Sequence, residues 1–253
     1  MRFKVEIKIC GINSYQSAKA SIGAEYIGFV FYPKSPRFLN AFDAKEIASH
    51  LNPAQKKVGL FVNADINVIK HISDFVNLDM IQLHGDETIE DIKIVKKMIK
   101  KPIIKALPVS RDKDIKNSKK IEEVCDMILF DSKASIGISG GTGISFDWNL
   151  LKNLKLRKKW MLAGGLNIDN IKNALSITNA PVVDISSGVE TKRGIKCKKK
   201  WMLAGGLNIS NVKSALTITN APIVDISSGV EIEKGIKCEK KIKNLINYLK
   251  NEN

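Results

Sequence analysis

The sequence predicts an α/β protein of the (β/α)8 barrel class, and three observations support this. Short apolar runs alternate with helical patterns, which is typical of β-α-β units in a parallel sheet. The runs are mainly apolar throughout, as strands buried on both faces require. The chain has 253 residues, a length at which such barrels commonly form one domain. We therefore expect residues 1–253 to form a single barrel domain.

Eight apolar runs are the predicted barrel strands, and polar or glycine-containing turns follow them. They are residues 6–10, 26–31, 57–62, 80–83, 103–107, 127–131, 160–163 and 182–186. Residues at the carboxyl ends of barrel strands and in the loops that follow carry the function of such proteins. The chain ends in a predicted amphipathic helix over 239–250, with Ile242, Leu245, Ile246 and Leu249 on one face.

One segment occurs twice in tandem. Residues 159–197, here the first copy, and residues 200–238, the second copy, are offset by 41 positions and identical at 31 of 39. Each copy reads as strand, Gly-Gly turn, helix, strand and Ser-Ser-Gly turn, so the chain offers an extra β-α-β segment. Only the second copy leads directly into the final helix. We therefore expect the second copy to close the barrel and the first to lie outside it, with self-association through the copy left unpaired.

Composition excludes several classes of protein. The net charge is +15, but the lysines are spread through helical segments and few aromatic residues accompany them, so we expect no nucleic-acid partner. Charges interrupt the N-terminus at once and there is no apolar run of about 18 residues, so we expect neither a signal peptide nor a membrane span. The four cysteines form no C-x-x-C pair, which favours a reducing cytoplasm.

Three glycine-rich turns follow the late strands and predict a phosphate site. Glycine lets backbone N–H groups approach an anion, and barrels often bind phosphate after their seventh and eighth strands. Any one turn alone would be read as a tight turn, whereas three in this order favour phosphate binding. The candidates are Gly141 and Gly143, then Gly205, Gly206, Ser227, Ser228 and Gly229 in the second copy, or Gly164, Gly165, Ser186, Ser187 and Gly188 in the first.

Four other residues have side chains suited to chemistry. Cys10 and Asp131 each end a predicted strand. A lone cysteine there is either a small buried residue or a functional thiol, and a carboxylate after four apolar residues is costly unless paired or used. Partial burial would raise the pKa of Asp131 and suit it to act as a general acid. Arg37 could bind a carboxylate through two hydrogen bonds, or be a surface arginine, and His84 is equally ambiguous.

Several motifs together resemble the phosphoribosylanthranilate isomerases of tryptophan biosynthesis. The resemblance runs from about residue 4 to the end apart from the extra copy, and the motifs are KICGI (8–12), GFVFYPKSPR (28–37), VGLFVN (58–63), IQLHGDE (81–87), FDS (130–132), GGTGISFDW (140–148), LAGGLN (162–167) and DISSGVE (184–190). It implies a (β/α)8 barrel that converts N-(5-phosphoribosyl)anthranilate, a small sugar phosphate, to 1-(2-carboxyphenylamino)-1-deoxyribulose 5-phosphate by an Amadori rearrangement, with no metal or cofactor.

The resemblance also implies residue roles. Asp131 would be the general acid and Cys10 the general base, and Arg37 would hold the anthranilate carboxylate. The glycine turns would hold the phosphate, and Asp184 or Asp225 would lie near the reacting amine. Two other hypotheses remain. The chain could be a non-catalytic phosphate-binding or self-assembling barrel disabled by the duplication, or another sugar-phosphate enzyme. The pairing of a cysteine with an aspartate argues against the latter.

Overall fold

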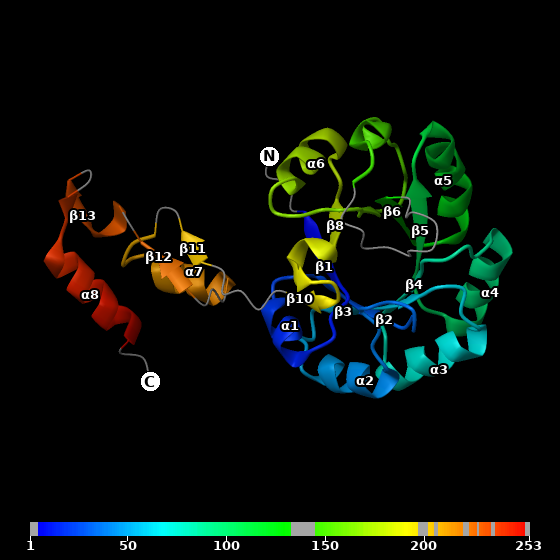
Figure 1. Ribbon diagram of the computed structural model, residues 1–253, viewed down its shortest axis with the longest axis horizontal. Helices are drawn as coiled ribbons and strands as arrows, with labels where there is room; N and C mark the ends of the chain where they lie inside the picture. The colour runs from blue at the N-terminus through cyan, green and yellow to red at the C-terminus, as the bar shows by residue number, and fades with distance from the viewer. Residues whose placement is uncertain are drawn as a thin grey trace. The chain divides into compact units, whose positions relative to one another are not determined.

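The computed structural model describes residues 5–132, 145–196, 202–204, 207–219, 223–226, 228–233 and 236–250. The chain forms two compact units, Met1–Lys198 and Lys199–Asn253, rather than the single domain expected from the sequence (Figure 1). No helix among the described residues is long and apolar enough to cross a bilayer.

Unit 1 contains a closed barrel of eight parallel strands in chain order, β1 to β8. Each predicted strand forms, with ends that differ from the prediction by at most two residues. The strands are β1 Glu6–Cys10, β2 Tyr26–Val30, β3 Lys56–Phe61, β4 Met80–Leu83, β5 Ile103–Val109, β6 Met127–Ser132, β7 Trp160–Leu162 and β8 Val182–Ile185.

Helices surround these strands in unit 1 (Figure 1). They are α1 Tyr15–Ala20, α2 Ala41–Ser49, α3 Ile66–Val76, α4 Ile89–Ile99, α5 Asp112–Val124, the 3-10 helix η1 Trp148–Leu151 and α6 Ile171–Thr178. Side-chain caps fix several of the helix starts. Ser14 and Thr88 form capping boxes at α1 and α4, and Asp65 accepts a hydrogen bond from the Asn67 N–H at α3.

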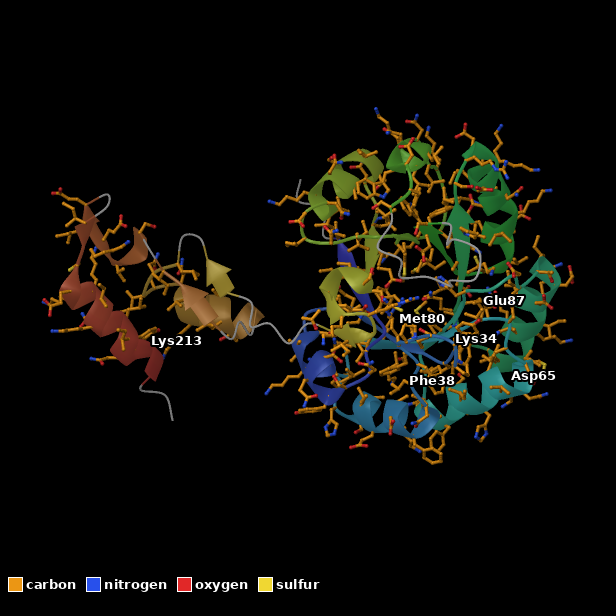
Figure 2. All side chains as sticks on the ribbon, in the orientation of Figure 1. Lys34, Phe38, Asp65, Met80, Glu87 and Lys213 are labelled. Carbon is orange, nitrogen blue, oxygen red and sulfur yellow. The ribbon has the colours of Figure 1, made fainter. Side chains whose placement is uncertain are left out.

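Side chains fill the interior of the barrel in layers. One buried cluster combines inward-facing residues of seven strands, and Met80 is seen inside the ring in Figure 2. A smaller cluster of Cys10, Val30 and Leu60 lies at the carboxyl ends of the strands. The largest cluster fills the space between strands and helices. The barrel is therefore a packed core, and its open end is the carboxyl end of the strands.

The first copy closes the barrel, and the expectation that it would lie outside is wrong for this structure. Its strands β7 and β8 pair with β6 and β1, and β8 runs in register with β1. When the first copy supplies the last two barrel strands, the chain passes directly from η1 to β7. No intervening copy then has to loop out of the barrel. After β8 comes a 3-10 turn, η2 Ser187–Val189, and an antiparallel hairpin of β9 Glu190–Lys192 and β10 Ile195–Lys196. This hairpin was not predicted from the sequence.

This hairpin follows β8, where a (β/α)8 barrel would continue into a helix. The outer face of β1 is more exposed as a result. The outward residues Ile7 and Ile9 are only partly buried, whereas all five residues of β2 are buried. The predicted final helix does form as α8, Glu239–Lys250, but it belongs to unit 2.

Unit 2 repeats the local structure of the first copy. It contains β11 Met202–Ala204, α7 Val212–Thr219, β12 Ile223–Asp225, η3 Ser228–Val230, and a hairpin of β13 Glu231–Glu233 and β14 Ile236–Lys237 before α8. Strands β11 and β12 pair in parallel as a two-stranded sheet. Val212, Val230 and Leu245 form a small buried cluster.

Candidate active site

A pocket lies at the carboxyl end of the barrel strands. Its lining brings together residues of strands β1, β2, β3, β6 and β8 and of the segments that follow β2, β3, β4, β7 and β8. The lining residues are Cys10, Val30, Tyr32, Ser35, Arg37, Leu60, Val62, His84, Asp131, Ala163, Gly164, Gly165, Leu166, Asp184, Ser186 and Ser187. Most of the candidates drawn from the sequence that lie in unit 1 therefore share one cavity.

Cys10 faces a buried ion pair. Strand register places Lys8 opposite Asp184, and the Lys8 Nζ lies 2.9 Å from Asp184 Oδ2, with both side chains almost fully buried. Burial raises the pKa of the Cys10 thiol; the charge of Lys8 opposes this rise, whereas Asp184 adds to it. The other oxygen of Asp184, Oδ1, is buried and has no hydrogen-bond partner among the described residues. An unsatisfied buried oxygen in a pocket is an acceptor available to a ligand.

The opposite wall of the pocket pairs Asp131 with His84. The His84 Nε2 lies 3.3 Å from Asp131 Oδ2, and the Gln82 amide nitrogen lies 2.8 Å from His84 Nδ1. If Gln82 donates to Nδ1, the imidazole carries its proton on Nε2 and donates it to Asp131. Asp131 Oδ1 accepts a hydrogen bond from the Ser132 N–H at 2.7 Å. His84, left ambiguous by the sequence, thus lies beside the proposed acid.

Buried charges fix the loop that carries His84. Lys105 reaches from β5 and its Nζ donates to the Gly85 carbonyl and to Glu87, each at 2.6 Å. Glu87 in turn accepts hydrogen bonds from the backbone N–H groups of Gly85 and Asn63. The pair of Lys105 and Glu87 is almost fully buried, so the loop after β4 has a defined position.

The Gly-Gly turn after β7 approaches Asp131 closely. Gly164 has a φ of +88°, and a side chain there would meet the Ser132 backbone nitrogen at 2.7 Å. Gly165, at a φ of +65°, continues this turn, which leads to α6. Glycine is therefore required here both by conformation and by space.

The second late turn differs from expectation at one residue. Ser186 and Ser187 line the pocket, but Gly188 does not. A Cβ at Gly188 would lie only 1.9 Å from the Leu166 carbonyl oxygen, so close packing explains this glycine.

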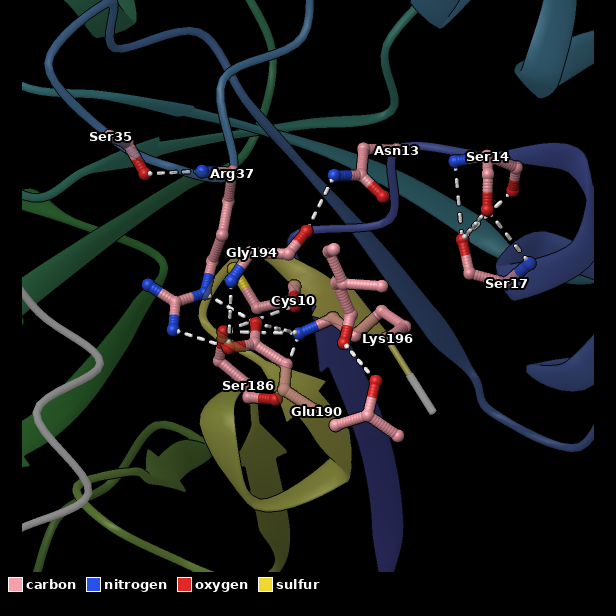
Figure 3. A network of polar contacts seen from close by, with 12 residues as sticks. Cys10, Asn13, Ser14, Ser17, Ser35, Arg37, Ser186, Glu190, Gly194 and Lys196 are labelled. Atoms are coloured by element: carbon pink, nitrogen blue, oxygen red, sulfur yellow. Dashed lines mark hydrogen bonds and ion pairs between the residues drawn. The ribbon is translucent and has the colours of Figure 1, made fainter. Parts of the chain in front are cut away.

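Arg37 lies in the pocket but is already paired. Its Nε and Nη2 donate to the two carboxylate oxygens of Glu190 at 2.6 and 2.8 Å, and both side chains are almost fully buried. Lys196 donates to Glu190 at 2.9 Å and to the Ser186 carbonyl at 2.8 Å (Figure 3). Glu190 and Lys196 were not among the residues predicted from the sequence. Both are repeated in the second copy as Glu231 and Lys237, which was the available signal.

The remaining candidates lie either outside the described residues or in unit 2. Gly141, Gly143, Gly205, Gly206 and Ser227 lie outside the described residues. Asp225 ends β12, and Ser228 and Gly229 lie in η3, all in unit 2. The described site is therefore built with the first-copy residues Gly164, Gly165, Asp184, Ser186 and Ser187.

Comparison with known proteins identifies the family. The family model for N-(5'-phosphoribosyl)anthranilate (PRA) isomerase matches residues 7–201 and again residues 195–248. The chain belongs to the PRA isomerase family. Among curated relatives, the N-(5'-phosphoribosyl)anthranilate isomerase of Rhodospirillum centenum is 41% identical over 195 residues, which is 75% of this chain and 91% of that protein. The enzyme of Paracoccus denitrificans is 41% identical over 194 residues, 75% and 90% respectively.

Solved structures of the PRA isomerase family share the barrel. The phosphoribosylanthranilate isomerase of Thermotoga maritima superimposes with a TM-score of 0.70 at 36% identity, covering 77% of this chain and 93% of that one. Another isomerase structure, solved with reduced 1-(o-carboxyphenylamino)-1-deoxyribulose 5-phosphate, has a TM-score of 0.67 at 35% identity, with the same coverage.

Proposed function

We propose that this chain catalyses the Amadori rearrangement of N-(5-phosphoribosyl)anthranilate to 1-(2-carboxyphenylamino)-1-deoxyribulose 5-phosphate in tryptophan biosynthesis. The observation that carries the proposal is that Cys10 and Asp131 line one pocket together with Arg37 and Asp184. The rearrangement needs an acid, a base and a site for an anionic aromatic amine, and this pocket contains a group suited to each. We also propose that the protein works in the cytoplasm.

The acid in this proposal is Asp131. Its protonated carboxyl group donates to the furanose ring oxygen, the C1–O bond breaks, and the amine lone pair forms the iminium ion. His84 contacts the same carboxyl group at 3.3 Å and orients it toward the sugar.

The base is Cys10. Its thiolate removes the C2 proton of the iminium ion, and the electrons of the C–H bond neutralise the nitrogen, giving an enolamine that tautomerises to the ketose. Because burial raises the pKa of Cys10, positive charge must favour the thiolate. Lys8 and Lys196 supply that charge, and the cationic iminium ion adds to it once formed.

Binding groups complete the proposed site. Arg37 holds the anthranilate carboxylate. The unpartnered Oδ1 of Asp184 accepts a hydrogen bond from the reacting amine. The turns with Gly164, Gly165, Ser186 and Ser187 hold the phosphate, together with Gly141 and Gly143. We assign these roles to the first copy.

The second copy has a different proposed origin and role. Its 31 identities with the first copy and the second family match at 195–248 support an internal duplication. In unit 2, β11 pairs with β12, whereas the equivalent β7 and β8 each have a further partner in the barrel. We propose that the outer edges of β11 and β12 pair with another chain, so the protein self-associates. Size-exclusion chromatography coupled to light scattering tests this self-association. A chain truncated after residue 198 should be monomeric under conditions in which the full chain is oligomeric.

The activity is tested with freshly prepared substrate, whose anthranilate-type fluorescence falls as it is consumed. Cys10→Ala and Asp131→Asn should each lower kcat by about 10²–10⁴-fold, the usual range for removing a general acid or base. An inactive parent chain that still binds inorganic phosphate would favour the alternative of a phosphate-binding barrel disabled by the duplication. Full activity in both variants would contradict the assigned chemistry.

A further inference from the structure

Glu190, at the start of β9, is the centre of a buried charge cluster that the rearrangement itself does not require. Its carboxylate accepts two hydrogen bonds from Arg37, one from Lys196 and one from the backbone N–H of Gly194 at 3.1 Å (Figure 3). Burial alone would raise the pKa of Glu190, but the hydrogen bonds from Arg37 and Lys196 hold it below its ordinary value. The carboxylate is therefore ionised at neutral pH.

The geometry of the pair leaves Arg37 able to bind a second carboxylate. A guanidinium group has five N–H donors, and Glu190 engages it side-on, through Nε and Nη2. The remaining nitrogen, Nη1, points away from Glu190 in Figure 3. The edge formed by Nη1 and Nη2 still presents two parallel N–H groups, which match the two oxygens of a carboxylate.

The charges in the cluster also favour an anionic ligand. Two cations, Arg37 and Lys196, share the single carboxylate of Glu190. The cluster therefore carries one net positive charge beside the pocket. If Glu190 paired with Arg37 alone, the pair would be neutral, and a ligand carboxylate would lose most of its electrostatic attraction.

Two glycines show how tightly the hairpin and the Arg37 side chain are packed. A Cβ at Gly194, whose φ is +82°, would lie 2.3 Å from the Pro36 carbonyl oxygen. On the other side, a Cβ at Gly11 would lie 2.7 Å from the Cδ of Arg37. Asn13 adds a hydrogen bond to the Gly194 carbonyl at 2.8 Å. The Arg37 side chain is thus held from its stem to its guanidinium group before any ligand arrives.

We propose that Glu190 is a positioning residue for substrate binding: it fixes the guanidinium group of Arg37 so that the free edge receives the aromatic carboxylate of the substrate. This inference rests on the proposed function, because it takes Arg37 as the carboxylate-binding group. It also assigns the role to the first copy, since the equivalent Glu231 lies in unit 2.

The test compares Glu190→Gln with Glu231→Gln, two identical changes at equivalent positions of the two copies. Glu190→Gln removes a negative charge, which by itself would strengthen the attraction for the substrate carboxylate. It should nevertheless raise KM for N-(5-phosphoribosyl)anthranilate by about 10–100-fold, because misplacement of a binding group by about 1 Å has effects of this size. Its kcat should change much less. Glu231→Gln should leave both parameters unchanged. The inhibition constant of inorganic phosphate should not rise in either variant, because phosphate does not use Arg37 and the loss of a negative charge can only favour an anion.

Controls separate positioning from a loss of folding. Circular dichroism and the melting temperature identify any variant that does not fold, and Glu190→Asp, which keeps the charge but shortens the side chain, should give an intermediate KM. In an Arg37→Lys background, Glu190→Gln should raise KM little further, because lysine lacks the forked edge that Glu190 orients.

The possible results distinguish the role of Arg37, the positioning role of Glu190 and the assignment of that role to the first copy. If Arg37→Lys itself leaves KM unchanged, the proposed role of Arg37 fails and the inference fails with it. If Arg37→Lys raises KM but folded Glu190→Gln does not, only the positioning role fails. A parallel rise in the phosphate inhibition constant would indicate general loosening of the pocket and overturn the proposal. An equal effect of Glu231→Gln would overturn the assignment to the first copy.

Discussion

Glu190 and Glu231 occupy equivalent positions in two segments of nearly identical sequence, yet they have different partners. Both pair with the lysine six residues later, Lys196 or Lys237, across the same small hairpin. Glu190 also binds Arg37, which lies 153 residues earlier in the chain. In unit 2, the carbonyl oxygen of Glu231 accepts a hydrogen bond from Lys241, ten residues later in the chain.

The helices show the same difference. Ala174 of α6 is completely buried, whereas the equivalent Ala215 of α7 is only partly buried. The turns before the two helices are nevertheless alike: the Asn167 N–H donates to Asn170 at 2.9 Å, and the Asn208 N–H donates to Asn211 at 2.8 Å. Local sequence thus determines the turn, helix and hairpin, whereas the site needs neighbours that only the first six strands provide.

The largest difference between the copies should appear at the equivalent aspartates of β8 and β12, Asp184 and Asp225. Asp184→Asn removes the partner of the fully buried Lys8 and should lower the free energy of unfolding of the barrel by about 3–5 kcal/mol, because an unpaired buried charge remains. Asp225→Asn leaves that pair intact and should change it by less than about 0.5 kcal/mol. Urea unfolding followed by circular dichroism measures both. Equal losses would mean that the two copies exchange places in the barrel.

A smaller but still clear difference is expected at the serine turns. Ser187→Asp places a carboxylate in the turn proposed to hold the phosphate and should raise KM about 10–100-fold through charge repulsion. Ser228→Asp, at the exposed equivalent in η3, should leave KM unchanged. Serine is a better test than Gly188, because any side chain at that glycine would clash with Leu166. Unchanged kinetics in both variants would contradict the phosphate assignment.

The pH dependence of stability should separate the two glutamates further. The folded pKa of Glu190 lies below the ordinary value of 4.5, so its carboxylate stabilises the fold above about pH 4.5, and this contribution is lost as the pH falls through the folded pKa. The stability difference between the parent and Glu190→Gln should therefore be constant at neutral pH and shrink in acid.

The matched change Glu231→Gln should cost less than about 1 kcal/mol at neutral pH, because solvent screens the ion pair that Glu231 forms with Lys237, whose side chain is 45% exposed. Chemical denaturation of the three proteins between pH 3 and pH 7 provides the comparison. A difference between the parent and Glu190→Gln that grows in acid would show that Glu190 is not held as a buried carboxylate.

The sequence predicted the elements well and their assembly less well. Apolar runs bounded by turns were enough to place all eight barrel strands, because strands buried on both faces must be apolar. The copy that closes the barrel was predicted wrongly. The helix after the second copy is visible in the sequence as an amphipathic pattern, whereas the contacts of the hairpin after the first copy form only in the folded barrel. The contact between Glu190 and Arg37 could not be predicted from the sequence, because it depends on closure of the barrel.

The smallest expected effect is one that the two copies should share. Asn170→Ala and Asn211→Ala each remove the side-chain oxygen that accepts the N–H of the asparagine three residues earlier. Each change should lower the local opening free energy by about 1–2 kcal/mol, because each side-chain hydrogen bond that is lost has a net value of about 1 kcal/mol. Amide hydrogen exchange resolves the two turns separately, because Asp169 and Ile171 in one are Ser210 and Val212 in the other. Asn170 also donates from Nδ2 to the Gly165 carbonyl at 2.9 Å, and Gly165 lines the pocket. A much larger effect at Asn170 than at Asn211 would therefore show that the surrounding barrel stabilises the first turn and that local sequence alone does not determine it.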